Sequence, residues 1–228
     1  MSTLSNFVKE ESMGFKEKPP GRRERAKEDK QRRIEEAARV LFAERGVGGV
    51  TTQQIADRAD VAIGTLYLYA ATKAELLIMV QNRKFGAAID DGLAAAEAPA
   101  RDALERVLAL ITPVVACLRE HPENGRIYLH ELVSGDPEEA HRREGLALSQ
   151  RLEEGVGGIL RRGSGIDRGD AAIRARVITS VIHVTTTATL HLGDPLPTLL
   201  AHLRHQIAVV APGRGGGGCG REQPLREL

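Results

Sequence analysis

The sequence predicts an all-α protein, with a small three-helix unit at the N-terminus and a larger helical domain after it. The chain is rich in alanine, leucine, glutamate and arginine, and patterns typical of strands are few. Apolar residues recur at the spacing of one helix face, and glycine-rich breaks separate these runs. The hydrophobic fraction of 42% suffices for a core, but aromatic residues make up only 3%. Aliphatic side chains must therefore fill this core.

Two short helical patterns lie close together in residues 51–77. The first covers 52–59, where Ile55, Ala56 and Ala59 share one face, and a threonine at position 51 or 52 caps its start. The second covers 63–69. Two helices of about two turns joined by a tight turn match a helix-turn-helix, whose second helix fits the major groove of DNA.

The segment ADVAIGTLYLYAATKAELL resembles the turn, recognition helix and following helix start of the TetR (tetracycline-repressor) family. The usual pattern of that family is A-G-V-S-x-G-T-L-Y-x-H-F-x-S-K-E-x-L, and the resemblance covers roughly residues 30–80. The residues that match are Ala59, Val61, Gly64, Thr65, Leu66, Tyr67, Lys73, Leu76 and Leu77. The departures are Asp60, Ala62, Tyr69 and Ala70.

Two of these departures affect the turn. Asp60 stands where the family usually has glycine, and aspartate tolerates a left-handed backbone less well than glycine but better than most residues. Ala62 stands where the family usually has serine, so the second helix loses a side-chain cap.

The resemblance implies a DNA-binding transcriptional regulator, most simply a repressor that responds to a ligand. It further implies a homodimer on a pseudo-palindromic DNA operator and a small-molecule effector bound in the C-terminal helical domain. We therefore expect a helix-turn-helix domain over 27–75 and a ligand-binding and dimerisation domain over 76–211. Residues 1–26 are expected to be a disordered basic arm, and residues 212–228 a flexible glycine-rich tail.

Charge is unevenly spread along the chain. Its net charge is only +1, but all lysines lie at or before Lys84, and residues 1–84 hold 16 Lys/Arg against 12 Asp/Glu. This asymmetry favours a nucleic-acid-facing N-terminal part, although a solvated surface would look the same. The basic cluster ahead of the first helix either tracks DNA phosphates or acts as a solubilising tail. It comprises Arg22, Arg23, Arg25, Lys27, Lys30, Arg32 and Arg33.

We expect eight residues to form the DNA-binding surface. Polar tips suggest that Thr65, Tyr67 and Tyr69 touch phosphates, and the resemblance gives Lys73 the same role. The alternative for Tyr67 is packing in the core. In the family, the positions of Gln53, Ile63 and Gly64 approach base edges, where a Gln amide can pair with adenine and Ile63 can touch a thymine methyl. Thr52, at the start of the first short helix, completes the set.

Further helices follow from apolar periodicity and caps. Phe42, Val47, Val50, Ile55 and Leu66 should form the core of the N-terminal unit. The helices are expected over 29–45, 72–96, 101–119 with a kink at Pro113, 124–133, 137–162, 170–192 and 197–210.

A mostly apolar cavity is expected between the helices 101–119, 124–133 and 137–162. The polar or polarisable candidates facing it are Cys117, Tyr128, His130 and Glu131. The last two helices carry more apolar residues than a small monomer core needs. The resemblance makes them the interface of a homodimer, and the alternative is packing within one chain.

Other chemistry has weak support. The chain lacks the H-E-x-x-H and C-x-x-C metal motifs, the G-x-S-x-G motif and any phosphate-binding loop, so we expect neither an enzyme nor a cofactor. Four histidines lie on the last two helical patterns, but surface or interface positions are the favoured interpretation, with no bound metal. These are His183, His191, His202 and His205.

Cys117 and Cys219 lie far apart, which argues against a structural disulfide and for a reducing cytoplasm. No apolar run reaches 18 residues, so we expect no membrane span. Two alternatives to a ligand-gated repressor stay open. One is a regulator gated by a protein partner or by oxidation of Cys117, and the other is a small helical enzyme or ligand carrier.

Overall fold

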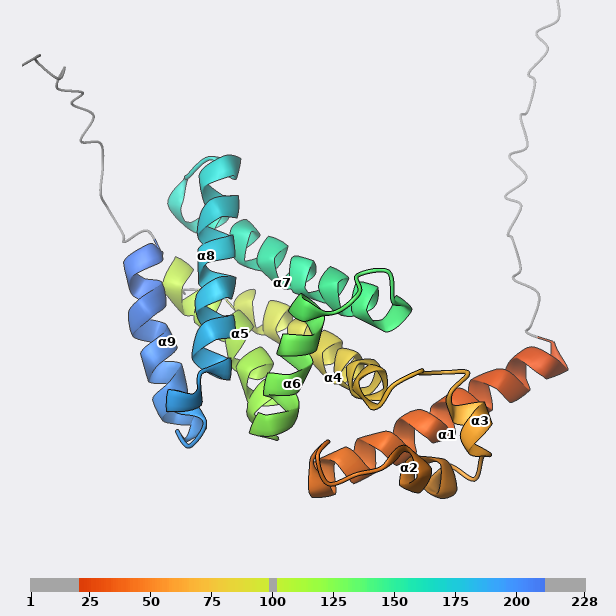
Figure 1. Ribbon diagram of the computed structural model, residues 1–228. Coiled ribbons are helices and arrows are strands. Elements are labelled where there is room, and N and C mark those ends of the chain that lie inside the picture. Colours follow the sequence, from red (N-terminus) through yellow and green to blue (C-terminus); the bar gives the residue numbers. More distant parts are fainter. Residues whose placement is uncertain (1–20, 99–101, 212–228) are drawn as a thin grey trace, which may run out of the picture.

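The computed structural model describes residues 21–98 and 102–211, and this part of the chain is helical without strands. Figure 1 shows a small unit, α1 to α3, at one end of a larger helical bundle. The predicted all-α class is confirmed. The first elements are α1 Arg22–Arg45, α2 Thr52–Arg58, α3 Ile63–Leu66, α4 Lys73–Ala96 and α5 Ala103–Arg119. The remaining ones are α6 Pro122–Ser134, α7 Ala140–Ser164, α8 Arg168–Thr187, the 3₁₀ turn η1 Thr189–His191 and α9 Leu196–Val210.

The three-helix unit forms because each of its helices buries one apolar stripe. The predicted core residues Phe42, Val47, Val50, Ile55 and Leu66 are all buried. Gly46 ends α1 with a positive φ of 67°, a conformation that glycine adopts without strain.

α1 begins at Arg22, earlier than expected, so the prediction of a disordered arm is wrong for residues 22–26. Arginine, glutamate, alanine and lysine are good helix formers, and this first turn is fully exposed. Composition alone does not separate a solvated helix from a disordered segment. Positions 1–20 of the expected arm, and the expected tail over 212–228, lie outside the described residues.

The turn between α2 and α3 contains Asp60 and Ala62, the two residues that depart from the family pattern there. Asp60 has φ 52°, the left-handed conformation that glycine usually supplies. Ala62 precedes α3 without any side-chain hydrogen bond to its first turn. α3 is a regular helix only to Leu66, whereas the pattern predicted it to Tyr69.

The long helix α4 leaves this unit and crosses the bundle along α5. Gly92 lies so close to α5 that a Cβ atom there would clash with the carbonyl oxygen of Leu110. Pro113 lies inside α5, which continues through it as one helix, and the kink expected there stays a prediction. None of the described helices is both long and apolar enough to cross a bilayer.

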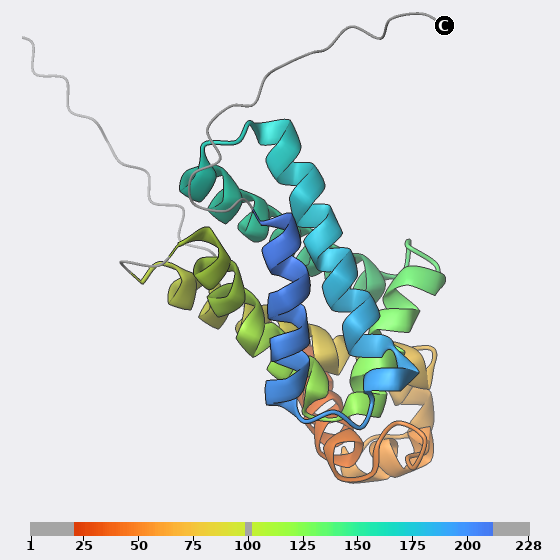
Figure 2. The same ribbon diagram turned by 90° about the vertical axis from the view of Figure 1, so that its left-hand side faces the viewer.

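Several boundaries in the bundle differ from the prediction. α6 begins at Pro122, after a cap by His121, and α7 begins only at Ala140. Pro137 therefore precedes α7, because the chain first makes a turn held by Asp136. α8 ends at Thr187, and η1 leads into α9, which lies alongside α8 in Figure 2.

Candidate nucleic-acid interface and ligand pocket

The helix-turn-helix has a buried side and an open side. Ile55 and Leu66 are fully buried, and Thr51 and Gln54 form a reciprocal capping box at the start of α2. Gln53 and Gly64 lie on the exposed side, with Ile63 and Thr65 half-buried beside them. This side of α2 and α3 is the surface that a major groove would meet.

At Gly64 the backbone of α3 is bare. A Cβ atom added there would meet nothing within 4 Å. Packing within the protein therefore does not require glycine at this position. The missing side chain instead leaves room for another molecule to approach the helix backbone closely.

The polar side chains near Gly64 contact one another. Tyr67 is 47% exposed, so the alternative that it packs in the core is wrong. Its hydroxyl lies 3.1 Å from Oγ1 of half-buried Thr52, which joins α3 to α2. Gln53 donates from Nε2 to Oδ1 of Asp57 at 2.7 Å, and both side chains are exposed. Reading a base would require Gln53 to leave this partner.

Tyr69 and Lys73 are engaged within the protein. The hydroxyl of half-buried Tyr69 donates to the carbonyl oxygen of Lys27 at 3.1 Å. Nζ of Lys73 donates to the carbonyl oxygen of Val50 at 3.0 Å and so holds the loop before α2. These contacts give both residues a structural role. Phosphate contacts for them stay a prediction.

The basic cluster lies beside α3. Arg33 pairs with Asp60 in the turn, with Nη1 and Oδ2 3.0 Å apart, and Tyr69 reaches the backbone of Lys27. Both contacts bring the N-terminal half of α1 next to α3, as Figure 1 shows. The exposed side chains there are Arg22, Arg23, Arg25, Lys27, Lys30, Arg32 and Arg33. Positive charge therefore adjoins the open side of the helix-turn-helix.

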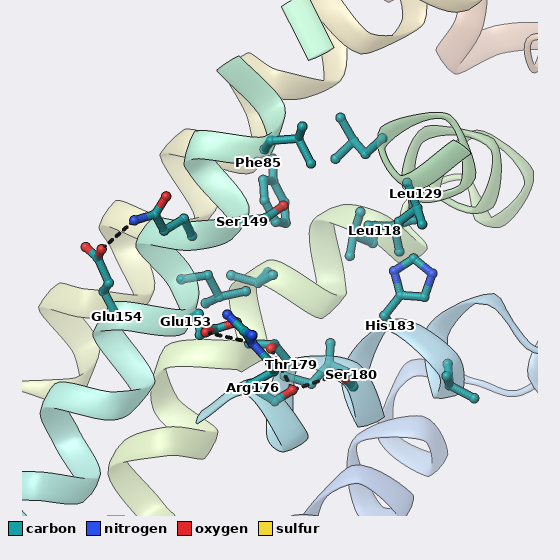
Figure 3. A pocket seen from close by; sticks show the side chains of 18 residues that line it. Phe85, Leu118, Leu129, Ser149, Glu153, Glu154, Arg176, Thr179, Ser180 and His183 are labelled. Carbon is teal, nitrogen blue, oxygen red and sulfur yellow. Dashed lines mark hydrogen bonds and ion pairs between the residues drawn. The ribbon is translucent and has the colours of Figure 1, made fainter. Parts of the chain in front are cut away.

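A pocket of about 820 Å³ lies among α4, α5, α6, α7 and α8. Half of its lining residues are aliphatic, and Phe85 of α4 adds an aromatic ring. Figure 3 shows Phe85, Leu118 and Leu129 near one another on this wall. A pocket is thus present between α5, α6 and α7, as predicted, but it is open to solvent rather than enclosed, and α4 and α8 line sides of it that the sequence did not indicate.

The polar groups of the pocket come chiefly from α7 and α8. Glu153 and Arg176 form an ion pair across these helices, with Oε1 and Nε 3.4 Å apart, and Thr179 and Ser180 lie beside them (Figure 3). Half-buried His183 also lines the pocket, and burial, followed by the nearby His130, lowers the pKa of its imidazole. The pocket therefore combines an apolar wall with a row of hydrogen-bonding side chains along one edge.

None of the four side chains proposed to face the pocket lines it. Cys117 points to a small cavity of about 80 Å³ near α1, and burial raises the pKa of its thiol to about 11. Tyr128 is fully buried, and its hydroxyl donates to Oδ1 of Asn82 at 2.9 Å. His130 lies in a separate site of about 340 Å³, which His183 also lines.

Glu131 is the fourth of these side chains. Its Oε2 lies 3.1 Å from Nη2 of Arg142, and its carbonyl oxygen accepts from Nε of the same guanidinium at 2.7 Å. The side chain of Arg142 is almost fully buried, so Glu131 balances a buried charge between α6 and α7. Periodicity indicated three of the five pocket helices, α5, α6 and α7, but not their inward faces.

Buried asparagines connect the pocket helices to the helix-turn-helix. Asn124 of α6 donates from Nδ2 to the carbonyl oxygen of Phe42 at 2.8 Å, and its Oδ1 accepts from the backbone N–H of Val47 at 2.9 Å. Because α6 also lines the pocket, this side chain joins the pocket wall to the end of α1.

A second connection runs through α4 and α7. Asn82 donates to the carbonyl oxygen of His141 at 2.8 Å, and Nε2 of His141 lies 3.2 Å from the carbonyl oxygen of Tyr69. The sequence alone did not assign a role to Asn82 or Asn124. An amide side chain on an otherwise apolar helix face could have indicated them, because a buried amide normally has hydrogen-bond partners.

The helix-turn-helix region matches a known protein family. Residues 34–80 match the family described as bacterial regulatory proteins, tetR family. The transcriptional repressor KstR of Rhodococcus jostii is 31% identical over 97 residues, which is 42% of this chain and 44% of the repressor. KstR of Mycobacterium tuberculosis is 38% identical over 60 residues, 26% of this chain and 27% of that protein. The chain thus matches less than half the length of these relatives.

Solved structures share the fold over more of the chain. A TetR transcriptional regulator from Rhodococcus sp. RHA1 superposes with a TM-score of 0.62 at 17% identity, over 80% of this chain and 95% of the other. The regulator FadR from Bacillus subtilis, solved in complex with stearoyl-CoA, has a TM-score of 0.59 at 22% identity. That match covers 79% of this chain and 97% of FadR.

Proposed function

We propose that this chain, which belongs to the tetR family of bacterial regulatory proteins, is a transcriptional repressor that a small molecule releases from DNA. The observation that carries the proposal is the open side of α2 and α3, bare at Gly64 and flanked by the basic end of α1. Such a surface suits a groove lined by phosphates. A regulator of this kind acts on cytoplasmic DNA and needs no catalytic group.

The repressor is proposed to act as a homodimer through α8 and α9. Ile173, Val177 and Val184 form an exposed apolar stripe on one face of α8. A stripe of this kind is costly in water and suits an interface. Two-fold symmetry would then present two copies of α3 to half-sites of a pseudo-palindromic operator.

The effector is proposed to be an amphipathic small molecule in the 820 Å³ pocket. Pockets of about 300–1,000 Å³ bury drug-sized ligands. The aliphatic wall would hold an apolar body, while Arg176, Thr179 and Ser180 would meet a polar end. Stearoyl-CoA, the molecule bound in the FadR structure, combines these two properties and is a reasonable first probe.

Release from DNA would follow from the contacts that α6 and α7 make with the helix-turn-helix. A ligand that moves α6 also moves Asn124, and with it the carbonyl of Phe42 and the N–H of Val47. This is a shift between two populations, to which the ligand contributes only its differential affinity. Thiol oxidation is the weaker alternative, because the raised pKa of Cys117 keeps its sulfur protonated.

A gel shift tests the proposal. The full chain should bind the DNA upstream of its own coding sequence more tightly than random DNA at the same salt concentration. Ile173→Glu combined with Val177→Glu should give monomers and weaken operator binding, whereas Ala147→Glu, at an exposed position on α7, should change neither. Equal binding to both DNAs would contradict the proposal.

A further inference from the structure

The connection between α8 and α9 brings three metal-binding side chains together. His191 ends the turn η1, Asp194 lies in the following loop, and His202 lies in α9. Each side chain offers one ligand atom, an imidazole nitrogen or a carboxylate oxygen, and these three atoms lie within 4.8 Å of one another. Figure 2 shows this connection at one end of the α8 and α9 pair. The sequence alone placed these histidines at a surface or an interface.

The distances suit a small cation. Nδ1 of His191 and Oδ2 of Asp194 form a hydrogen bond of 2.8 Å, and Nδ1 of His202 lies 3.9 Å from the same oxygen. Metal–ligand bonds of about 2.0–2.2 Å in a tetrahedral zinc site place neighbouring ligand atoms about 3.3 Å apart. The two observed separations lie on either side of that value. A bound cation would replace the hydrogen bond between His191 and Asp194, and the side chains would have to rotate to bring all three ligand atoms to bonding distance.

The segment that carries His191 and Asp194 is held by hydrogen bonds from Arg119 to its backbone. Nη2 of Arg119, at the end of α5, donates to the carbonyl oxygens of His191, Leu192 and Asp194 at 2.9, 3.0 and 2.9 Å. The positive charge of Arg119 opposes a cation, and the carboxylate of Asp194 offsets it. Holding the ligands in place before binding lowers the entropic cost of closing the site.

We propose that His191, Asp194 and His202 bind a zinc ion. Two imidazoles and a carboxylate are a ligand set that zinc accepts, whereas magnesium and calcium prefer oxygen ligands alone. The side chain of His202 is 46% exposed, so the fourth coordination position faces solvent. None of the three residues lines the 820 Å³ pocket, and the site is therefore separate from the proposed effector site.

Zinc at this position would tie the η1 loop to α9 and thereby stabilise the turn between the two helices. Because the ion would bind the folded chain, it should raise the midpoint of thermal unfolding. The effect does not depend on DNA binding.

The test uses the metal-free, untagged full chain in competition with a chromophoric chelator. It carries Cys219→Ser, because this thiol lies outside the described residues and can itself bind zinc. One zinc ion should bind per chain and raise the thermal midpoint. The isosteric Asp194→Asn, and separately His202→Ala, should weaken zinc binding by about tenfold or more. His205→Ala, one turn along α9, is the matched control and should bind zinc as the parent does.

Circular dichroism should show that all variants retain the helical content of the parent. Three results would overturn the proposal: no zinc uptake by the parent, undiminished uptake by both ligand variants, or an equal loss in His205→Ala.

Discussion

Replacing Gly64 with alanine should weaken operator binding while leaving the fold intact. The change adds one methyl carbon, which projects about 1.5 Å from the backbone. That carbon would meet no atom of the protein within 4 Å. Alanine is also the better helix former, by up to about 1 kcal/mol, so the folded chain should be as stable as before or slightly more stable.

The expected loss of affinity follows from the same geometry. If the backbone of α3 approaches base edges at van der Waals distance, an added methyl must displace the helix or the DNA. We expect a loss of at least about tenfold, which corresponds to about 1.4 kcal/mol. Fluorescence anisotropy with labelled operator DNA measures this loss, and urea unfolding measures stability in parallel.

Gly193→Ala is the matched control. Gly193 is exposed, and a Cβ atom there would also meet nothing within 4 Å, but it lies in the loop before α9. This variant should bind operator DNA as the parent does. Unchanged operator affinity in Gly64→Ala would refute the assignment of α3 as the helix that enters the groove. A loss that accompanies a fall in stability would refute the claim that space at Gly64 is free.

Four further predictions concern single side chains. Lys73→Ala should lower the slope of log affinity against log salt by about one unit, and an unchanged slope would rule out a phosphate contact. Gln53→Ala should cost about 1–3 kcal/mol on operator DNA and little on random DNA, while Asp57→Ala, which frees Gln53, should not weaken binding. Because burial raises the pKa of the Cys117 thiol to about 11, this thiol should resist alkylation by iodoacetamide at neutral pH until the chain unfolds. Peptide mapping measures the alkylation, and rapid labelling of the folded chain would restore oxidation of Cys117 as an alternative. Burial lowers the pKa of His183, so the unfolded chain binds a proton at this imidazole more tightly than the folded chain does, and the free energy of unfolding should fall as pH drops below about 6.5. Urea unfolding at two pH values should show a smaller fall in His183→Gln than in the parent. An equal fall in both would exclude this imidazole as the cause.

The helix-turn-helix was predictable because its signals are local. The cap at Thr51, the left-handed backbone at Asp60 and the apolar positions Ile55 and Leu66 all act within a few residues. The extra turns at the start of α1 were not predictable in this way, since a fully exposed helix has no apolar stripe to mark it.

The pocket and the zinc cluster depend on contacts between distant segments. Arg176 and His183 reach the pocket only because α8 packs across α6 and α7, and helical periodicity does not say which helices become neighbours. Likewise, Asp194 joins two histidines because Arg119 of α5 fixes the loop backbone. Sequence spacing alone left Asp194 without a role.

A DNase I footprint on the DNA upstream of the coding sequence tests the central claim most directly. A homodimer with two copies of α3 should protect a two-fold symmetric segment whose half-sites lie about one helical turn, or a multiple of it, apart. The protection should weaken in Gly64→Ala and persist in Gly193→Ala. Protection without symmetry, or none at protein concentrations that also coat random DNA, would contradict a repressor that reads its operator through α3.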